Sequence, residues 1–299
     1  MAEEQRIFYE WPGDMRSIAG GTRTTIKLSR PWQEEIKPHK GNCPFCDPND
    51  PARIQYFEEA DGWWLRQNIF TPYPFHQMVV PAKCWEPNEL RTLGGEKIAT
   101  ALGIALDTVQ KCKAPSVFIT VHIGSLAGQN LPHLHWHIVQ YNMFDSRTSV
   151  GEDMLGRYFH LDVPEGISWK LRRPDLVLFQ NLVFTAVVGG VRAGQCFILQ
   201  STRPEIRGNK DLYCSASLHC LAESIYKIVS LYNKKFLSTE GLPPDFNIAI
   251  SCYDGSIQYA LYTPILNHWG SAEQAALYEK CHITLPWPHE TTALYLKSD

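Results

Sequence analysis

Three histidines, His133, His135 and His137, alternate with apolar residues in the sequence His-Leu-His-Trp-His-Ile. Such alternation, with aromatic and β-branched residues between, predicts a strand whose successive side chains point to opposite faces. We therefore expect the three imidazoles to line one face and the apolar side chains to face a core. Imidazoles this close together suit a nucleophile, a metal site or both, and a polar strand face without chemistry is the simpler alternative.

The residues just before the histidines, 124–132, read Gly-Ser-Leu-Ala-Gly-Gln-Asn-Leu-Pro. Small and amide side chains in such a run predict a turn whose backbone N–H groups can come close to an anion. The sequence thus places a candidate anion-binding loop directly before the three imidazoles.

A second group of residues that could bind a metal or react is Cys43-Pro-Phe-Cys46, which lies between Asn, Asp and Pro residues. Two thiolates at this spacing can bind one Zn²⁺ at about 2.3 Å each, and a tetrahedral site then needs two more ligands. A redox pair is an alternative, but it would usually follow a strand and open a helix, which these neighbours do not favour. Two thiols without a metal are the third possibility.

Composition limits the classes of function. The chain has 299 residues, 44% hydrophobic and 20% charged, with a formal net charge of −3, which is typical of a soluble globular protein with one or two domains. We find no long basic run, so we expect neither a nucleic-acid nor a membrane partner. Nine cysteines, an odd number, with no secretory signal at the N-terminus indicate reduced thiols, and we expect a cytoplasmic protein.

The elements that must position these residues can be read in the first half of the chain. Residues 1–40 are interpreted as an N-terminal arm with a short strand at 24–28. Residues 63–81 predict two strands around a proline-rich turn, and 96–111 predict a helix with an apolar stripe. With a strand at 116–121 and the histidine strand, residues 41–140 form one compact α+β unit.

The second half repeats this order more weakly. After a connecting segment at 141–180, residues 182–199 can be laid on residues 63–80 without a gap, and a helix is predicted at 215–235. A strand at 246–251 follows, and Tyr259–Tyr262 stands where the histidine strand would be, so this copy has lost the imidazoles. A short helix is expected at 272–280. The expected fold is α+β, with two tandem units at 41–140 and 181–299, each an antiparallel sheet with a packed helix.

These motifs resemble the histidine-triad (HIT-like) superfamily, in the tandem-copy branch of galactose-1-phosphate uridylyltransferase and the diadenosine tetraphosphate phosphorylases. The family pattern of a Gly, Ala-Gly-Gln-Ser and His-x-His-x-His (or His-x-His-x-Gln) stands here as Gly124, residues 127–130 and the three histidines. The block at 68–81 is similar to the family's ribose-contacting strand and the hairpin that follows. The resemblance covers residues 41–140 well and the second copy more weakly.

The resemblance implies that His135 is the nucleophile, attacking the α-phosphorus of a nucleotide to form a nucleotidyl-histidine, and that His137 donates to the phosphate or leaving group. The physical requirement is a neutral imidazole whose other nitrogen donates to an acceptor. The nucleotide- and phosphate-binding residues implied are Asn68, His122, Gly128, Gln129 and Asn130. Of these, His122 stands where the family has Asn, and Asn130 where it has Ser; a turn-capping role is the alternative for Asn68.

The resemblance also implies a structural zinc beside the nucleophile. Three of the family's ligand positions are Cys43, Cys46 and His133, and the fourth, the last of Pro-x-x-His, is Cys84. Cys₃His is a common structural zinc set, so the replacement keeps the chemistry, although Cys84 could instead be a buried inert thiol. Zinc there would fix the loop and orient His135 two residues away.

The implied function is nucleotidyl transfer, as a nucleotidylyltransferase or phosphorylase acting on an NDP-sugar or dinucleoside polyphosphate. Because His137 stands where the uridylyltransferases have Gln, a HIT-type phosphoanhydride hydrolase, including one acting on RNA caps, is an alternative. A non-catalytic nucleotide-binding module is the other alternative. The partners expected are a nucleotide-containing small molecule and phosphate, a sugar phosphate or water as acceptor, in a monomer or homodimer.

Overall fold

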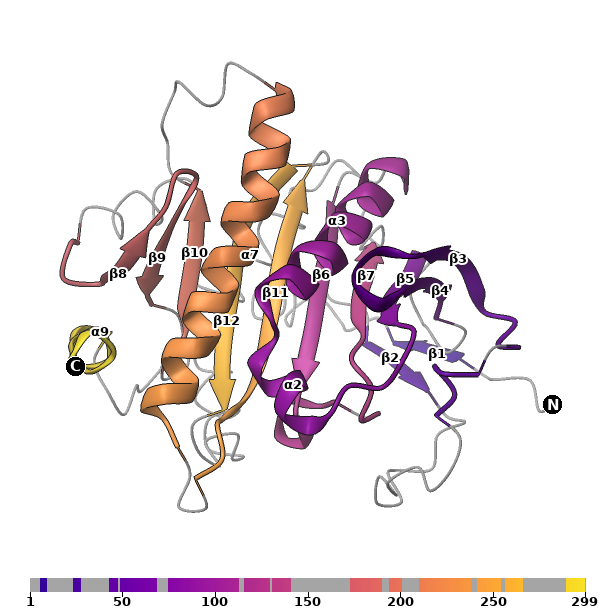
Figure 1. The fold of residues 1–299 in the computed structure, drawn as a ribbon, viewed down its shortest axis with the longest axis horizontal. Helices are drawn as coiled ribbons and strands as arrows, with labels where there is room; N and C mark the ends of the chain where they lie inside the picture. The colour runs from indigo at the N-terminus through magenta and orange to yellow at the C-terminus, as the bar shows by residue number, and fades with distance from the viewer. Residues whose placement is uncertain are drawn as a thin grey trace.

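The fold is α+β, with a large antiparallel sheet and few helices (Figure 1). The computed structural model describes residues 6–9, 24–27, 43–47, 49–68, 75–112, 116–129, 131–140, 173–189, 194–200, 210–237, 241–253, 256–265 and 289–298. In these residues ten strands form one sheet, and β1 (Arg6–Tyr9) and β2 (Thr24–Lys27) form a separate antiparallel pair.

Every neighbouring pair in the large sheet is antiparallel. From one edge to the other its strands are β3 (Arg53–Phe57), β4 (Trp63–Gln67), β5 (Phe75–Pro81), β7 (Trp136–Gln140), β6 (Ser116–Ile123), β11 (Asp245–Tyr253), β12 (Ser256–Ile265), β10 (Cys196–Gln200), β9 (Phe184–Val188) and β8 (Val177–Gln180). Read inward from each edge, the orders β3-β4-β5-β7-β6 and β8-β9-β10-β12-β11 correspond. The halves meet where β6 pairs with β11.

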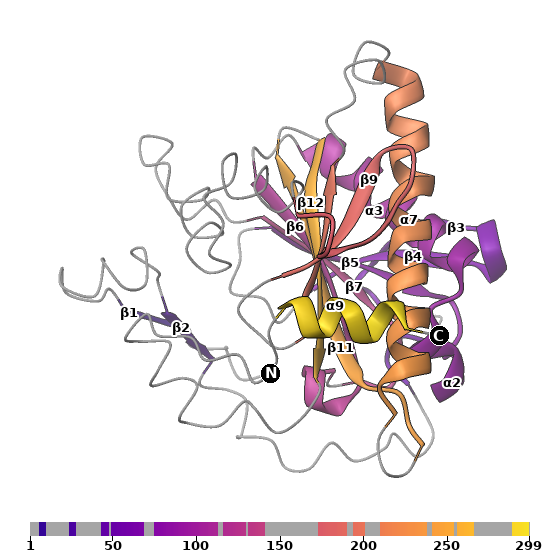
Figure 2. The same cartoon turned by 90° about the vertical axis from the view of Figure 1, so that its left-hand side faces the viewer.

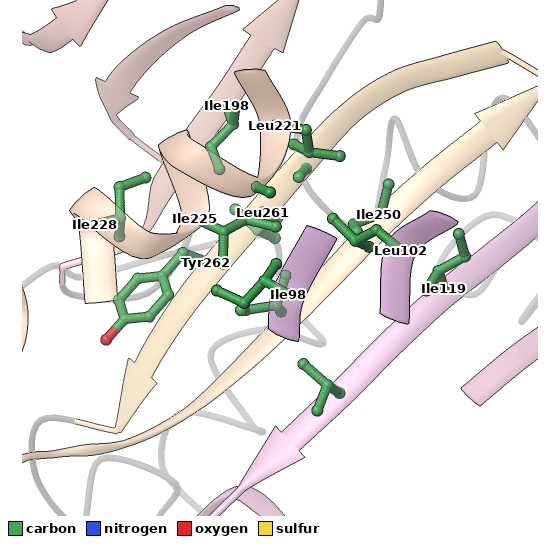
Figure 3. Packing of buried hydrophobic residues seen from close by; sticks show 14 of the residues in the cluster. Ile98, Leu102, Ile119, Ile198, Leu221, Ile225, Ile228, Ile250, Leu261 and Tyr262 are labelled. Carbon is green, nitrogen blue, oxygen red and sulfur yellow. The ribbon is translucent and has the colours of Figure 1, made fainter. Parts of the chain in front are cut away.

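Two long helices, α3 (Gly95–Cys112) and α7 (Lys210–Lys235), pack side by side on one face of the sheet (Figures 1 and 2). Figure 3 shows side chains at this contact, with Ile98 and Leu102 from α3 beside Ile225 from α7. These three side chains are almost fully buried, and each contributes about 1.5–3 kcal/mol through removal from water. The shorter helices are α2 (Pro87–Thr92) and α9 (His289–Lys297), and two 3₁₀ turns are η2 (Glu59–Asp61) and η3 (Ser125–Ala127).

Most elements predicted from the sequence are confirmed. The helices predicted at 96–111 and 215–235 lie within α3 and α7, and the strands predicted near 63–81, 116–121 and 246–251 correspond to β4, β5, β6 and β11. Among the strands and α-helices, β1, β3 and α2 were not predicted. Two more are additional: β8 lies within the segment interpreted as a connection, and α9 lies in the tail interpreted as irregular. The helix expected at 272–280 lies outside the described residues, as do most of the arm and residues 141–172.

The histidine strand is shorter than predicted. β7 begins only at Trp136, so His133 and His135 precede it. Its ladders with β5 and β6 both end at Trp136, which pairs with Val79 and Val121, so the residues before it leave the sheet on both sides. The predicted faces nevertheless hold, because Leu134, Trp136 and Ile138 are buried in the main hydrophobic core.

None of the helices in the described ranges is long and apolar enough to cross a membrane.

Candidate active site and metal centre

A cluster of residues that could hold a metal ion, called the metal cluster below, lies at the end of β5, where the Cys43–Cys46 turn meets the segment before β7. The ligand atoms of Cys43, Cys46, Cys84 and His133 all lie within 4.8 Å of one another. His133 Nδ1 lies 3.3 Å from the Sγ of Cys43, 3.6 Å from that of Cys46 and 3.1 Å from that of Cys84. The structure thus brings together the four residues that the sequence analysis proposed as ligands.

The orientation of His133 suits a metal ligand. Its Nε2 donates to the Pro81 carbonyl at 2.9 Å, which leaves the Nδ1 lone pair facing the three thiols. Metal-binding histidines commonly donate their second nitrogen to a carbonyl in this way. Around a tetrahedral zinc ion with Zn–S bonds of about 2.3 Å, neighbouring ligand atoms lie about 3.5–3.8 Å apart, close to the 3.5 Å between Cys46 Sγ and Cys84 Sγ. The residues present therefore fit a metal ion.

His135 lies outside this metal cluster. Its Nδ1 donates to the His133 carbonyl at 2.7 Å, which fixes the tautomer and leaves Nε2 unprotonated. Burial lowers the pKa of His135 to about 4, so its ring is neutral at neutral pH. The side chain is only 3% exposed, so atoms that cover Nε2 must move before a substrate can reach it.

Phe45, between the two cysteines of the turn, connects the metal cluster to His135. Its ring contacts the rings of His133 and His135 edge-on, each at a centroid distance of 5.4 Å. The guanidinium of Arg66 also lies on the Phe45 ring, 4.4 Å from its centroid. Arg66 forms an ion pair with Asp50 at 2.6 Å. The Cys43–Cys46 turn therefore packs directly against both histidines.

His137 lies next to His135 and also contacts two further imidazoles, those of His76 and His122. The ring of His137, the first histidine within β7, lies 4.8 Å from that of His135 and 5.7 Å from that of His122. His137 Nδ1 shares one proton with His76 Nε2 at 2.8 Å. Burial, with the neighbouring imidazoles of His135 and His76, holds the pKa of His137 well below its usual value. His137 is thus neutral and oriented by His76.

His76 and Asn247 are site residues that the sequence analysis did not identify. His76 comes from β5, on the strand next to β7. Asn247 comes from β11 in the second half, and its Oδ1 accepts from His122 Nδ1 at 2.5 Å. The alternation of His76 with Met78 and Val80, which puts the imidazole on the same strand face as two buried apolar residues, could have indicated His76. Nothing in the sequence indicated Asn247, because its contact spans 125 positions.

The glycine-rich loop follows β6. Gly124 N–H donates to Gln129 Oε1 at 2.8 Å, and Gln129 N–H donates to the Gly124 carbonyl at 3.1 Å. Gln129 is 8% exposed, and its buried Nε2 has no hydrogen-bond partner among the described residues. Gly128 adopts φ +89°, in the left-handed region that favours glycine, and is exposed. Asn130 lies outside the described residues.

Asn68 follows β4, and its Nδ2 lies 3.2 Å from His76 Nε2. Its backbone N–H donates to the His76 carbonyl at 2.9 Å. The structure therefore places Asn68 next to the imidazole pair of His76 and His137.

Comparison with solved structures shows a shared fold. The chain is similar to a uridylyltransferase, at a TM-score of 0.63 and 18% identity over 91% of this chain and 94% of that chain. It is similar to an ADP-glucose phosphorylase from Arabidopsis thaliana with bound ADP-glucose, at a TM-score of 0.63 and 11% identity over 99% of both chains. A GalT-like protein from Arabidopsis thaliana gives a TM-score of 0.60 and 11% identity over 85% and 91%.

No protein-family model and no curated protein matches the sequence. The predicted resemblance to the uridylyltransferase and phosphorylase branch is confirmed at the level of the fold.

Proposed function

We propose that this protein is a nucleotidyltransferase that forms a covalent nucleotidyl-histidine on His135. The donor is an NDP-sugar or a dinucleoside polyphosphate, and the acceptor is phosphate or a sugar phosphate. The proposal depends mainly on one observation: the His133 carbonyl accepts from His135 Nδ1, so the remaining nitrogen of a neutral ring carries a lone pair and belongs to no metal cluster. A nucleophilic imidazole requires this arrangement.

The glycine-rich loop supplies donors for the phosphate oxygens. Because Oε1 of Gln129 already accepts from Gly124, its unpartnered Nε2 is a buried donor that a non-bridging oxygen would satisfy. Donors already oriented toward developing charge stabilise a phosphoryl-transfer transition state. We propose that Gln129, with the Asn130 side chain, binds the α-phosphate, and that the exposed Gly128, whose own N–H donates to the Ser125 carbonyl, lets the phosphate come close to the loop.

His137 serves the leaving group. We assign the proton shared by His76 Nε2 and His137 Nδ1 to His76, so that His137 Nε2–H can donate a hydrogen bond to the departing oxygen, which leaves as an anion without taking the proton. We assign His122, held by Asn247, to the nucleotide phosphates, and Asn68 to the ribose.

The reaction has two balanced steps. In the first, His135 Nε2 forms a bond to the α-phosphorus while the bond from phosphorus to the leaving oxygen breaks, releasing a sugar phosphate or nucleotide. In the second, an acceptor oxygen forms its bond to phosphorus and the N–P bond breaks, which restores neutral His135. The fold shared with an ADP-glucose phosphorylase and a uridylyltransferase supports a nucleotide-sugar donor.

We propose that the metal cluster holds a structural zinc ion, which fixes His133 and, through its carbonyl, the tautomer of His135. We also propose that the two halves of the sheet are tandem HIT-like units at 41–140 and 181–299. Their matching strand order supports two units, and because it includes β8 (Val177–Gln180), the second unit then begins a few residues before 181.

The test is to trap the intermediate. The purified protein is incubated with ADP-glucose, UDP-glucose or diadenosine tetraphosphate without an acceptor, and intact mass and peptide mapping locate any added nucleoside monophosphate. We expect one adduct per chain on His135 and none in His135→Asn. Added phosphate or sugar phosphate should discharge it faster than water alone.

Two outcomes favour other functions. Discharge by water as fast as by either acceptor would identify a hydrolase. Nucleotide binding without adduct or turnover, unchanged in His135→Asn, would identify a non-catalytic binding module and reject the proposal.

A further inference from the structure

Asp245 is a buried carboxylate that the proposed chemistry does not use. It is the first residue of β11, in the second half of the chain, and is 6% exposed. Its Oδ2 accepts from the backbone N–H of Leu126 at 2.8 Å, and its Oδ1 pairs with Arg91 Nη2 at 2.8 Å. A buried charge needs such partners, so this carboxylate is held from both sides by the first half.

The Leu126 N–H belongs to the glycine-rich loop, and the carboxylate also lies directly against Gly124. Gly124 adopts φ +92°, and a Cβ there would come within 2.0 Å of Asp245 Oδ1. Any other residue at Gly124 would therefore displace the carboxylate. Asp245 thus contacts the loop at two points, by a hydrogen bond at Leu126 and by packing at Gly124.

Gly124 in turn fixes Gln129. Its N–H occupies Gln129 Oε1, and its carbonyl accepts from the N–H groups of Ala127 and Gln129. These bonds determine which end of the Gln129 amide is left to donate. A contact chain therefore runs from Asp245 through Gly124 to the unpartnered Nε2.

Arg91 keeps the carboxylate in place. This residue of α2 donates from Nη1 to the Pro243 carbonyl at 2.7 Å, and its own carbonyl accepts from Asn233 Nδ2 of α7 at 2.9 Å. Arg91 is thus fixed by the segment before β11 and by α7. The loop of the first half is held in place by contacts with the second.

We propose that Asp245, held by Arg91, is a positioning residue for nucleotidyl transfer: it fixes the Gly124–Gln129 loop so that Gln129 Nε2 meets the transferred phosphate. The inference rests on the proposed function. The second half then contributes to the reaction rate without touching substrate, in addition to its contribution to the core.

The test compares Asp245→Ala and Asp245→Asn with Asp175→Asn, an exposed carboxylate just before β8 that pairs with Arg173 at 2.5 Å. The measurements are the single-turnover rate of adduct formation on His135, kcat and KM for ADP-glucose with phosphate, and the melting temperature. All rates are taken well below melting.

We expect Asp245→Ala to lower the adduct rate and kcat at least tenfold while KM changes less than threefold, because the loop donors act on the transition state. Asp245→Asn should recover part of the rate, since its amide oxygen can still accept from Leu126. Asp175→Asn should match the wild type.

A folded Asp245→Ala protein that forms the adduct at the wild-type rate overturns this inference alone. A rate that falls only in proportion to the folded fraction also overturns it, because it indicates a purely structural role. If the wild type forms no adduct with any donor, the proposed function fails and the inference fails with it.

Discussion

The two halves of the sheet have the same strand order but differ at corresponding positions. In the first half, β5 pairs with β7, and Met78 faces His137; in the second, β10 pairs with β12, and Phe197 faces Leu261. Matching Met78 to Phe197 assigns counterparts through these registers. The pairs are His137 with Leu261, His135 with Tyr259, His122 with Ser251, and His76 with Gln195.

The same strand order thus carries different side chains in the two halves. Tyr259 and Leu261 are each at most 2% exposed, so an aromatic and an apolar side chain fill the places of His135 and His137, whereas the counterparts of His122 and His76 are buried polar residues. Buried imidazoles that hydrogen-bond to one another contribute less hydrophobic stabilisation than apolar or aromatic side chains do. At the positions of His135 and His137 the second half therefore supports stability, whereas the first is specialised for chemistry.

The largest expected effect comes from truncating His135, and it is compared with the truncation of its counterpart Tyr259. His135→Ala should lower kcat/KM by at least about 10³-fold, because it removes the nucleophile. Tyr259→Ala should lower the free energy of unfolding by about 3–5 kcal/mol, because it leaves a cavity in the core, and leave kcat/KM within about threefold. Steady-state kinetics and denaturant unfolding measure the two effects.

Tyr259→Phe is the control, because it keeps the ring and removes only the hydroxyl. A folded Tyr259 variant as inactive as His135→Ala would show that the second half takes part in chemistry at this position, contrary to the comparison.

Much of this division could be predicted from sequence. The period-two pattern placed Leu134, Trp136 and Ile138 in the core, and Tyr259–Tyr262 indicated a second copy without the imidazoles, which would serve as a scaffold and as part of the wall of the site. Such local patterns report which face a residue occupies. The four metal-cluster residues could be proposed only through a family resemblance, since Cys84 has no distinctive local pattern.

Register and long-range contacts could not be predicted. The gapless overlay of residues 182–199 on 63–80 would pair Leu182 with Gln200, as Trp63 pairs with Pro81, but Phe184 pairs there instead, a shift of two positions. The contact of Asn247 with His122 depends on how β11 pairs with β6, which neither strand specifies alone.

The next effect concerns metal binding. Among the described residues, only the first half has a cluster of side chains that could hold a metal ion. Cys43→Ser should release the bound ion and lower the free energy of unfolding by at least about 3 kcal/mol, a fraction of the ~10–16 kcal/mol with which zinc-finger peptides hold zinc. Metal analysis and denaturant unfolding measure this.

Cys220→Ser is the matched control, because Cys220 is also a half-buried free thiol but belongs to the second half. It should keep one ion per chain and unfold like the wild type. Full metal content in Cys43→Ser would remove Cys43 from the site and weaken the contrast between the halves.

The smallest effect concerns Asn247, a residue of the second half that contacts an imidazole of the first. Removing its single hydrogen bond to His122 should cost about 1 kcal/mol of transition-state stabilisation, so Asn247→Ala should lower kcat/KM about fivefold. His122→Ala combined with Asn247→Ala should be no worse than His122→Ala alone, because the two side chains act through one bond. Ser251→Ala, on the same face of β11, should have wild-type kinetics. Additive losses in the double variant would mean that Asn247 acts on substrate independently, and the second half would then be part of the catalytic site.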